Sequence, residues 1–149
     1  MAAANWDAWR FLLGEWTGTG GGTPGQGGGD LSFHLDLQEQ VLVRRNHVDF
    51  PAAADRPAFS HDDLTIIYPD SAGSTRTVYF DNEGHVIHYS VTMEANTIIM
   101  TSEPDPSTSR FRTTYWKGEN ETAITRFEIA PPGKPEGFAI YIEGIIQRK

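Results

Sequence analysis

Alternating apolar and polar residues fill short segments of the chain from Asp30 to its end. Every second residue from Leu31 to Leu37 is apolar, and the same holds from Ile87 to Met93. A period of two places alternate side chains on opposite faces of a β-strand. The pattern therefore predicts strands with one buried face and one face in water.

Turn residues separate these segments at intervals of about ten residues, which is typical of antiparallel sandwiches and barrels. Short connections make neighbouring strands pair as hairpins, and a long meander removes its exposed edges by closing. We therefore predict an all-β fold, a single antiparallel up-and-down β-barrel of about ten strands that forms one domain over residues 1–149. The predicted strands cover residues 14–20, 30–38, 40–50, 60–68, 74–81, 85–94, 96–103, 109–117, 120–130 and 137–147.

The first residues follow a different period. Trp6, Trp9 and Leu13 are spaced as on one face of a helix, and Asn5 is a good N-cap. Gly14 stands where a helix would end. The pattern predicts one short N-terminal helix that covers an end of the barrel.

Glycine is concentrated near the start of the chain, with nine of the 15 glycines in residues 14–29. From Gly20 to Gly29 this composition predicts a flexible loop between the first two strands. The spacing of Gly20, Gly22 and Gly25 matches a dinucleotide-binding pattern, but that site needs a helix N-terminus directly after the glycines. More glycine follows instead, so we interpret the segment as a loop.

The charge balance excludes several partners. Twelve Lys and Arg against 20 Asp and Glu give a net charge of −8. A chain this acidic lacks the positive surface that attracts nucleic acids and anionic lipids, so we expect no nucleic acid and no membrane as a partner. The absence of cysteine excludes disulfides and thiolate metal sites. The N-terminus has neither a basic region nor a long apolar segment, and we expect a soluble cytoplasmic protein.

The segment LLGEWTGTG, residues 12–20, joins the predicted helix to the first strand. A helix followed by Gly-x-Trp at this place resembles the calycin barrels, which include the lipocalins, the fatty-acid-binding proteins and the nitrobindin-like proteins. The strand count and the form Gly-x-Trp-x-Gly-x-Gly are most similar to the nitrobindin-like branch. The resemblance implies that Trp16 plugs the base of the barrel and that Arg148 lies over its ring as a structural partner.

Two features differ from these families. Fatty-acid-binding proteins carry two helices after the first strand, where this chain is rich in glycine, a poor helix former. Nitrobindin-like haem proteins use a histidine late in the chain as the axial ligand, whereas all five histidines here lie at or before His88. We therefore expect no haem and no other cofactor.

The histidines also predict no metal site. His85 and His88 would lie on opposite faces of a strand, so that one ion could not easily bind both. His61, Asp62 and Asp63 are adjacent and cannot all converge on one ion. We interpret both groups as exposed polar residues of hairpins.

Polar residues in step with apolar ones indicate the chemistry of the interior. Arg44 and Asn46 alternate with Leu42 and would face inward in one register; in the other, Val41 and Val43 face inward and Arg44 lies outside. The sequence supports both. A buried arginine needs a carboxylate, water or an anionic ligand. The predicted cavity-lining residues are Phe33, Leu35, Arg44, Asn46, Tyr79, Ile87, Tyr89, Met100, Tyr115, Phe127 and Ile140.

This mixture predicts a small barrel that binds a hydrophobic or amphipathic small molecule, with an acid or hydroxyl group on the ligand. Two alternatives stay open. The cavity could serve an enzyme, such as an isomerase or a haem-dependent peroxynitrite scavenger. The barrel could also be plugged and act through its surface. The sequence does not decide the oligomeric state.

Overall fold

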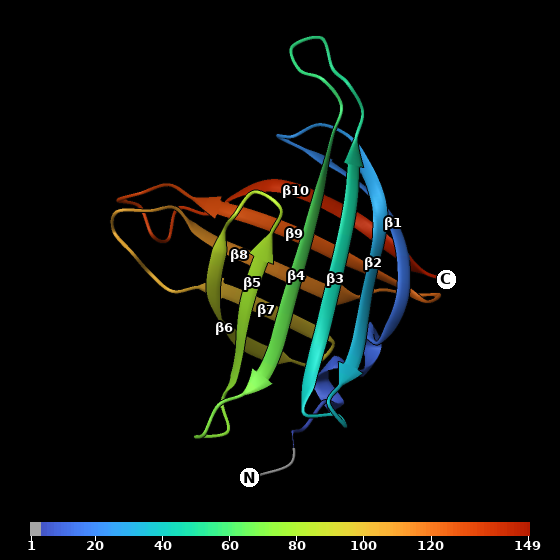
Figure 1. Ribbon diagram of the computed structural model, residues 1–149, viewed down its shortest axis with the longest axis vertical. Coiled ribbons are helices and arrows are strands. Elements are labelled where there is room, and N and C mark those ends of the chain that lie inside the picture. Colours follow the sequence, from blue (N-terminus) through green and yellow to red (C-terminus); the bar gives the residue numbers. More distant parts are fainter. Residues whose placement is uncertain (1–3) are drawn as a thin grey trace.

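The protein is a closed β-barrel in a computed structural model that describes residues 4–149 (Figure 1). Ten antiparallel strands follow chain order around the barrel, and β1 pairs with β10 to close it. This confirms the predicted up-and-down barrel. The elements are η1 (Asp7–Leu12), β1 (Gly14–Gly22), β2 (Gly27–Asp36), β3 (Val41–Phe50), β4 (Phe59–Pro69), β5 (Thr75–Asp81), β6 (Val86–Glu94), β7 (Thr97–Ser102), β8 (Arg110–Lys117), β9 (Thr122–Ala130) and β10 (Ala139–Arg148).

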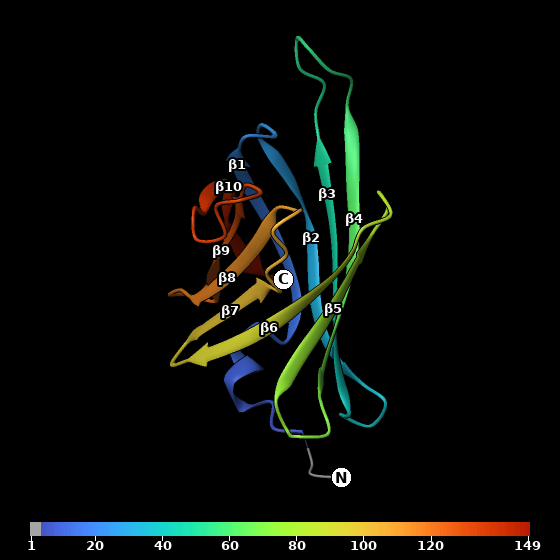
Figure 2. The ribbon, with the colours of Figure 1, turned by 90° about the vertical axis from the view of Figure 1, so that its left-hand side faces the viewer.

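The two ends of the barrel differ. The short helix η1 lies at one end, which we call the closed end (Figure 2). The turns after β1, β3, β5, β7 and β9 lie at the other, which we call the open end, because the strands alternate in direction. The β3–β4 hairpin projects farthest there (Figure 1). Within residues 4–149, no helix is long and apolar enough to cross a membrane.

The predicted N-terminal helix is present as a six-residue 3-10 helix. Trp6 precedes it, and the Asn5 side chain accepts a hydrogen bond from the backbone N–H of Asp7 at 2.9 Å. The helix buries Trp9 and Leu12. Gly14 follows with φ of 115°, a left-handed conformation that suits glycine, and it begins β1. Only Leu13 therefore separates the helix at the end of the barrel from the first strand.

Apolar side chains fill the closed end. Trp9, Leu12 and Trp16 are each at most 1% exposed, and Trp16 donates a hydrogen bond from Nε1 to the Leu12 carbonyl at 2.7 Å. Each is packed against inward-facing residues of the strands above it. The other fully buried apolar residues of this cluster are Phe33, Leu42, Ile67, Ile98, Tyr115 and Ala123.

The predicted flexible loop at Gly20–Gly29 is wrong. β1 continues to Gly22 and β2 begins at Gly27, so that only residues 23–26 form the connection. The strands need these glycines because neighbouring backbone approaches closely. A Cβ atom on Gly29 would lie 1.7 Å from the carbonyl oxygen of His47, and one on Gly20 would lie 2.8 Å from that of Glu143. Glycine is intrinsically unfavourable in strands, and here the pairing with neighbouring strands outweighs that tendency.

Candidate ligand-binding cavity

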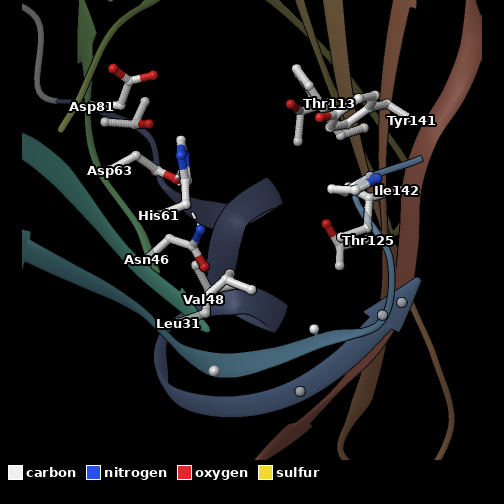
Figure 3. A pocket seen from close by; sticks show the side chains of 18 of the residues that line it. Leu31, Asn46, Val48, His61, Asp63, Asp81, Thr113, Thr125, Tyr141 and Ile142 are labelled. Atoms are coloured by element: carbon white, nitrogen blue, oxygen red, sulfur yellow. Dashed lines mark hydrogen bonds and ion pairs between the residues drawn. The ribbon is translucent and has the colours of Figure 1, made fainter. Parts of the chain in front are cut away.

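Above the packed closed end, the side chains leave a cavity of about 380 Å³ that reaches the open end. Its lining includes residues of the open-end turns, among them Pro24 and Glu83. Figure 3 shows polar side chains of β3 to β5 on one side and side chains of β8 to β10 opposite. The volume falls within the usual range of small-molecule sites, roughly 300–1,000 Å³.

One side of the cavity is a polar wall, formed by Arg44, Asn46, His61, Asp63, Tyr79 and Asp81 of β3, β4 and β5. These residues alternate along their strands with outward-facing neighbours. In the pairing of β3 with β4, Asn46 lies directly opposite Asp63. Arg44 faces inward, so the register with Val41 and Val43 facing inward is not the one formed.

An ion pair lies at the base of the polar wall. Arg44 donates from Nη1 to Asp63 and from Nε to the Tyr115 hydroxyl at 2.7 Å. The Arg44 side chain is 12% exposed and the Asp63 side chain is 4% exposed. Asn46 donates to the second oxygen of Asp63 at 2.9 Å. The carboxylate that a buried arginine requires is therefore supplied by the protein itself.

The pKa values agree with this pairing. Burial alone would raise the pKa of Asp63, but the Arg44 charge and hydrogen bonds from His61 and Asn46 outweigh it and hold the pKa below its usual range. Burial alone would lower the pKa of Arg44, but Asp63 and Tyr115 outweigh it and raise the pKa. Both groups are thus charged at neutral pH, since each stabilises the ionised form of the other.

A chain of polar contacts continues from Asp63 toward the open end. His61 Nε2 lies 3.3 Å from Asp63 Oδ2 and 3.1 Å from the Tyr79 hydroxyl. Tyr79 donates to Asp81 Oδ2 at 3.0 Å, and Nδ1 of His85 lies 2.8 Å from the same oxygen. The hydrogen bond with Asp63 is the main cause of the raised pKa of His61. The polar wall is thus a connected network that holds its side chains in place.

The side opposite is an aromatic wall, formed by Phe111, Phe127 and Tyr141 of β8, β9 and β10. The rings of Phe111 and Phe127 are stacked with centroids 5.9 Å apart, and Phe127 meets Tyr141 edge to face at 5.9 Å. Thr113 and Thr125 lie on the same side (Figure 3). A ligand between the two walls would therefore meet charged groups on one side and aromatic and threonine side chains on the other.

A third side of the cavity is a glycine wall, in which β1, β2 and β10 present bare backbone. Gly18 and Gly20 continue the inward face of Trp16, while Gly27 and Gly29 continue that of Leu31. A Cβ atom at any of these four positions would lie 2.8 Å or less from an atom of a neighbouring strand or of Phe50. Residues that looked like a loop in the sequence therefore form one side of the cavity, and close packing restricts them to glycine.

The eleven predicted lining residues fall into three groups. Those that line the cavity are Arg44, Asn46, Tyr79, Ile87, Tyr89, Met100 and Phe127. Phe33 and Tyr115 are fully buried below it in the closed-end core, and Leu35 packs against that core. Ile140 is a correction: it is 50% exposed and does not line the cavity. The register of β10 against β9 shifts between Ile140 and Ile142, and this bulge breaks the alternation used to place it.

Arg148 and Trp16 lie as the calycin resemblance implies. The guanidinium carbon of Arg148 is 4.3 Å from the Trp16 ring centroid. Arg148 also donates to the carbonyls of Leu13 and, at 2.9 Å, Phe11. The arginine therefore ties the last strand to η1 across the closed end, in addition to its cation–π contact.

Sequence reasoning missed the inward direction of two residues. His61 and Asp63 were interpreted as exposed, yet both belong to the polar wall, while Asp62 between them is exposed and lies 2.7 Å from His47. The missed signal is alternation with buried Thr65 and Ile67 on the same strand. His85 lies at the cavity rim and His88 is exposed. Within residues 4–149, no group of three or more His, Asp or Glu side chains could hold a metal ion.

The similarity of this chain to known proteins concerns its fold. No family model matches the chain, and a search of curated proteins found no match. The crystal structure of Rv2717c from M. tuberculosis is similar, with a TM-score of 0.65 and 15% identity over 97% of this chain and 96% of that one. A protein of unknown function from the DUF3598 family of Nostoc punctiforme PCC 73102 has a TM-score of 0.35 and 8% identity, over 99% of this chain and 100% of that one. The similarity to Rv2717c supports a shared barrel fold and says nothing of activity.

Proposed function

We propose that this protein is a calycin-like barrel that binds an amphipathic small molecule in its cavity. The single observation that carries the proposal is the cavity of about 380 Å³ between a polar wall and an aromatic wall. Burial of apolar ligand surface against the rings supplies affinity, and the polar network fixes orientation. The Gly-x-Trp segment and the contact between Arg148 and Trp16 support the calycin resemblance.

A fluorescence titration tests the proposal. N-phenyl-1-naphthylamine, a neutral apolar reporter, should bind saturably with a micromolar Kd, about 8 kcal/mol, because the cavity offers area and few specific contacts. Thr113→Phe places a ring inside the cavity and should weaken binding by at least about tenfold. Thr92→Phe makes the same change on an exposed outer position and is the control. Equal binding by both variants would place the reporter outside the cavity.

A second candidate function is proton transfer to or from the bound molecule. His61 favours it, because its ring lines the cavity within reach of both Asp63 and Tyr79. An imidazole in such a position can act as a general acid or base. Deuterium exchange next to the carbonyl of a small cyclic ketone, followed by NMR in heavy water, should be accelerated by the protein and lost in His61→Gln. Exchange at the buffer rate would remove this candidate.

A further inference from the structure

The charged residues that line the cavity are unequal in sign. Among the described residues of the lining, Arg44 is the only arginine or lysine. Three carboxylates belong to the polar wall or to the turn above it: Asp63, Asp81 and Glu83. Asp30 and Glu143 also line the cavity, and they pair with Lys149 and Arg126. Negative charge is therefore in excess on the side that would meet the polar end of a ligand.

The one arginine is already neutralised. Arg44 is bound to Asp63 and to the Tyr115 hydroxyl, and Asn46 and His61 hold Asp63 in place from its other side. An incoming carboxylate would have to displace a carboxylate that has three partners of its own. The protein's own Asp63 therefore occupies the position at Arg44 that an acid group of the ligand would need.

Asp81 adds a fixed negative charge nearer the open end. Its Oδ1 accepts hydrogen bonds from the backbone N–H groups of Glu83 and His85 at 3.0 and 2.9 Å. Its side chain is 4% exposed. Burial alone would raise the pKa of Asp81, but hydrogen bonds from His85 and Tyr79 outweigh it and keep the pKa below its usual value. The carboxylate therefore stays ionised although it is shielded from water.

Two histidines lie among these carboxylates. His61 lies between Asp63 and Glu83, with Nδ1 3.2 Å from Glu83 Oε1, and His85 lies against Asp81. Arg44 and a protonated His61 together supply two positive charges against the three carboxylates of Asp63, Asp81 and Glu83. The excess is largest in mildly alkaline solution, where ordinary imidazoles are neutral.

The aromatic wall carries no charge of its own. Phe111, Phe127 and Tyr141 stand across the cavity from the carboxylates, together with the hydroxyls of Thr113 and Thr125. Aromatic rings attract a cation where a ring face is turned toward it. The sign of the preference therefore comes from the carboxylates of the polar wall, where the Arg44 guanidinium is already bound to Asp63.

From these two walls we infer that the cavity selects ligands whose polar end is positively charged, an amine or quaternary ammonium on an apolar body, over carboxylic acids. The inference rests on the proposed function and deepens it. The cationic group lies between the aromatic wall and the carboxylates of Asp81 and Glu83, and the apolar body extends toward Met100 and Leu31 at the closed end.

A matched competition series tests the selectivity. Octyltrimethylammonium, 1-octanol and octanoate share one apolar chain and differ in charge; each displaces N-phenyl-1-naphthylamine at about pH 8.5 and low salt. The ammonium compound should bind most tightly and octanoate at least about tenfold more weakly. Octanoate binding equally well or better would overturn the inference and leave the proposed function intact. Absence of saturable reporter binding would overturn the proposed function and the inference with it.

A variant pair separates the cavity charges from the net charge of −8. Glu83→Gln removes a carboxylate of the lining from an exposed turn, so the fold should survive. Glu94→Gln removes the same charge from an exposed residue at the closed end. The ratio of the Kd values of octanoate and octyltrimethylammonium should fall several-fold in Glu83→Gln only. An equal fall in both variants would assign the preference to overall charge and overturn the inference.

Discussion

The two halves of the barrel use the same strands for opposite purposes. β2 places Phe33 in the dry core of the closed end and Gly29 beside the cavity. β3 likewise places Leu42 in the core and Arg44 in the polar wall. Alternation decides which face a residue occupies, and position along the strand decides whether that face is packed or hollow.

The comparison teaches where stability and function reside. In the closed end, tryptophan and leucine side chains interlock with little space, as in most protein interiors. In the open end, the polar wall is held by hydrogen bonds while the glycine wall contributes no side chains. Substitutions in the closed end should therefore affect folding first, and those in the open end should affect binding first.

The largest expected effect is that of Trp16→Ala in the closed end. Loss of a fully buried ring, together with its contact to Arg148, should lower the free energy of unfolding by about 3–5 kcal/mol. Phe127→Ala, on the aromatic wall, should cost less, about 1–2 kcal/mol, because its ring already borders empty space. Urea unfolding followed by circular dichroism measures both. Equal losses would contradict the division between the two ends.

The next effect tests whether the polar wall is an exception to that division. Asp63→Leu leaves the Arg44 guanidinium buried without a carboxylate and should cost about 3 kcal/mol. Arg44→Met combined with Asp63→Leu should be closer to the parent protein than the single variant is, because no unpaired charge remains. Additive losses in the double variant would mean that the pair itself is not what stabilises the wall.

Acid titration of the folded protein should show the same stabilising effect of the Asp63 carboxylate. The pKa of Asp63 is lowered in the folded protein, so its stabilising contribution is complete above the ordinary carboxyl pKa, about 4, and is lost as the pH falls below it. The free energy of unfolding measured by urea should drop in that window. The double variant without Arg44 and Asp63 should show a smaller drop.

The barrel itself could be predicted from the sequence because its signals are local. Turn residues and alternation set the strands, as in Leu31–Leu37, and closure follows from the meander. The wall positions were harder. Ile140 was misplaced by a bulge, and the pair of Arg44 with Asp63 was missed because its two members lie on different strands. Pairing across strands and backbone crowding at Gly29 depend on register, which a single sequence specifies weakly.

A smaller effect should distinguish two neighbouring glycines at the open end. Gly29→Ala would place Cβ 1.7 Å from the His47 carbonyl and should cost about 1–3 kcal/mol through displaced backbone. Gly28→Ala is the matched control, because its nearest contact would be 3.3 Å, at the Gly18 carbonyl. Thermal unfolding of the two variants gives the comparison. Similar melting temperatures would show that β2 and β3 can separate at Gly29 without loss of stability, which would contradict the close approach of Gly29 to the His47 carbonyl.

The smallest expected effect concerns His61, which links the polar wall to the open-end turn. The pKa of His61 is raised in the folded protein, first by its hydrogen bond with Asp63. Its contribution is therefore present below the ordinary imidazole pKa, about 6.5, and is lost as the pH rises through the higher folded value. Stability should fall by less than about 1 kcal/mol across this window, since the side chain is partly solvated. His61→Gln should remove that slope, whereas His88→Gln, an exposed outer position, should keep it. NMR titration of the ring protons assigns the slope directly, and a midpoint for His61 at or below the ordinary value would contradict the contact with Asp63.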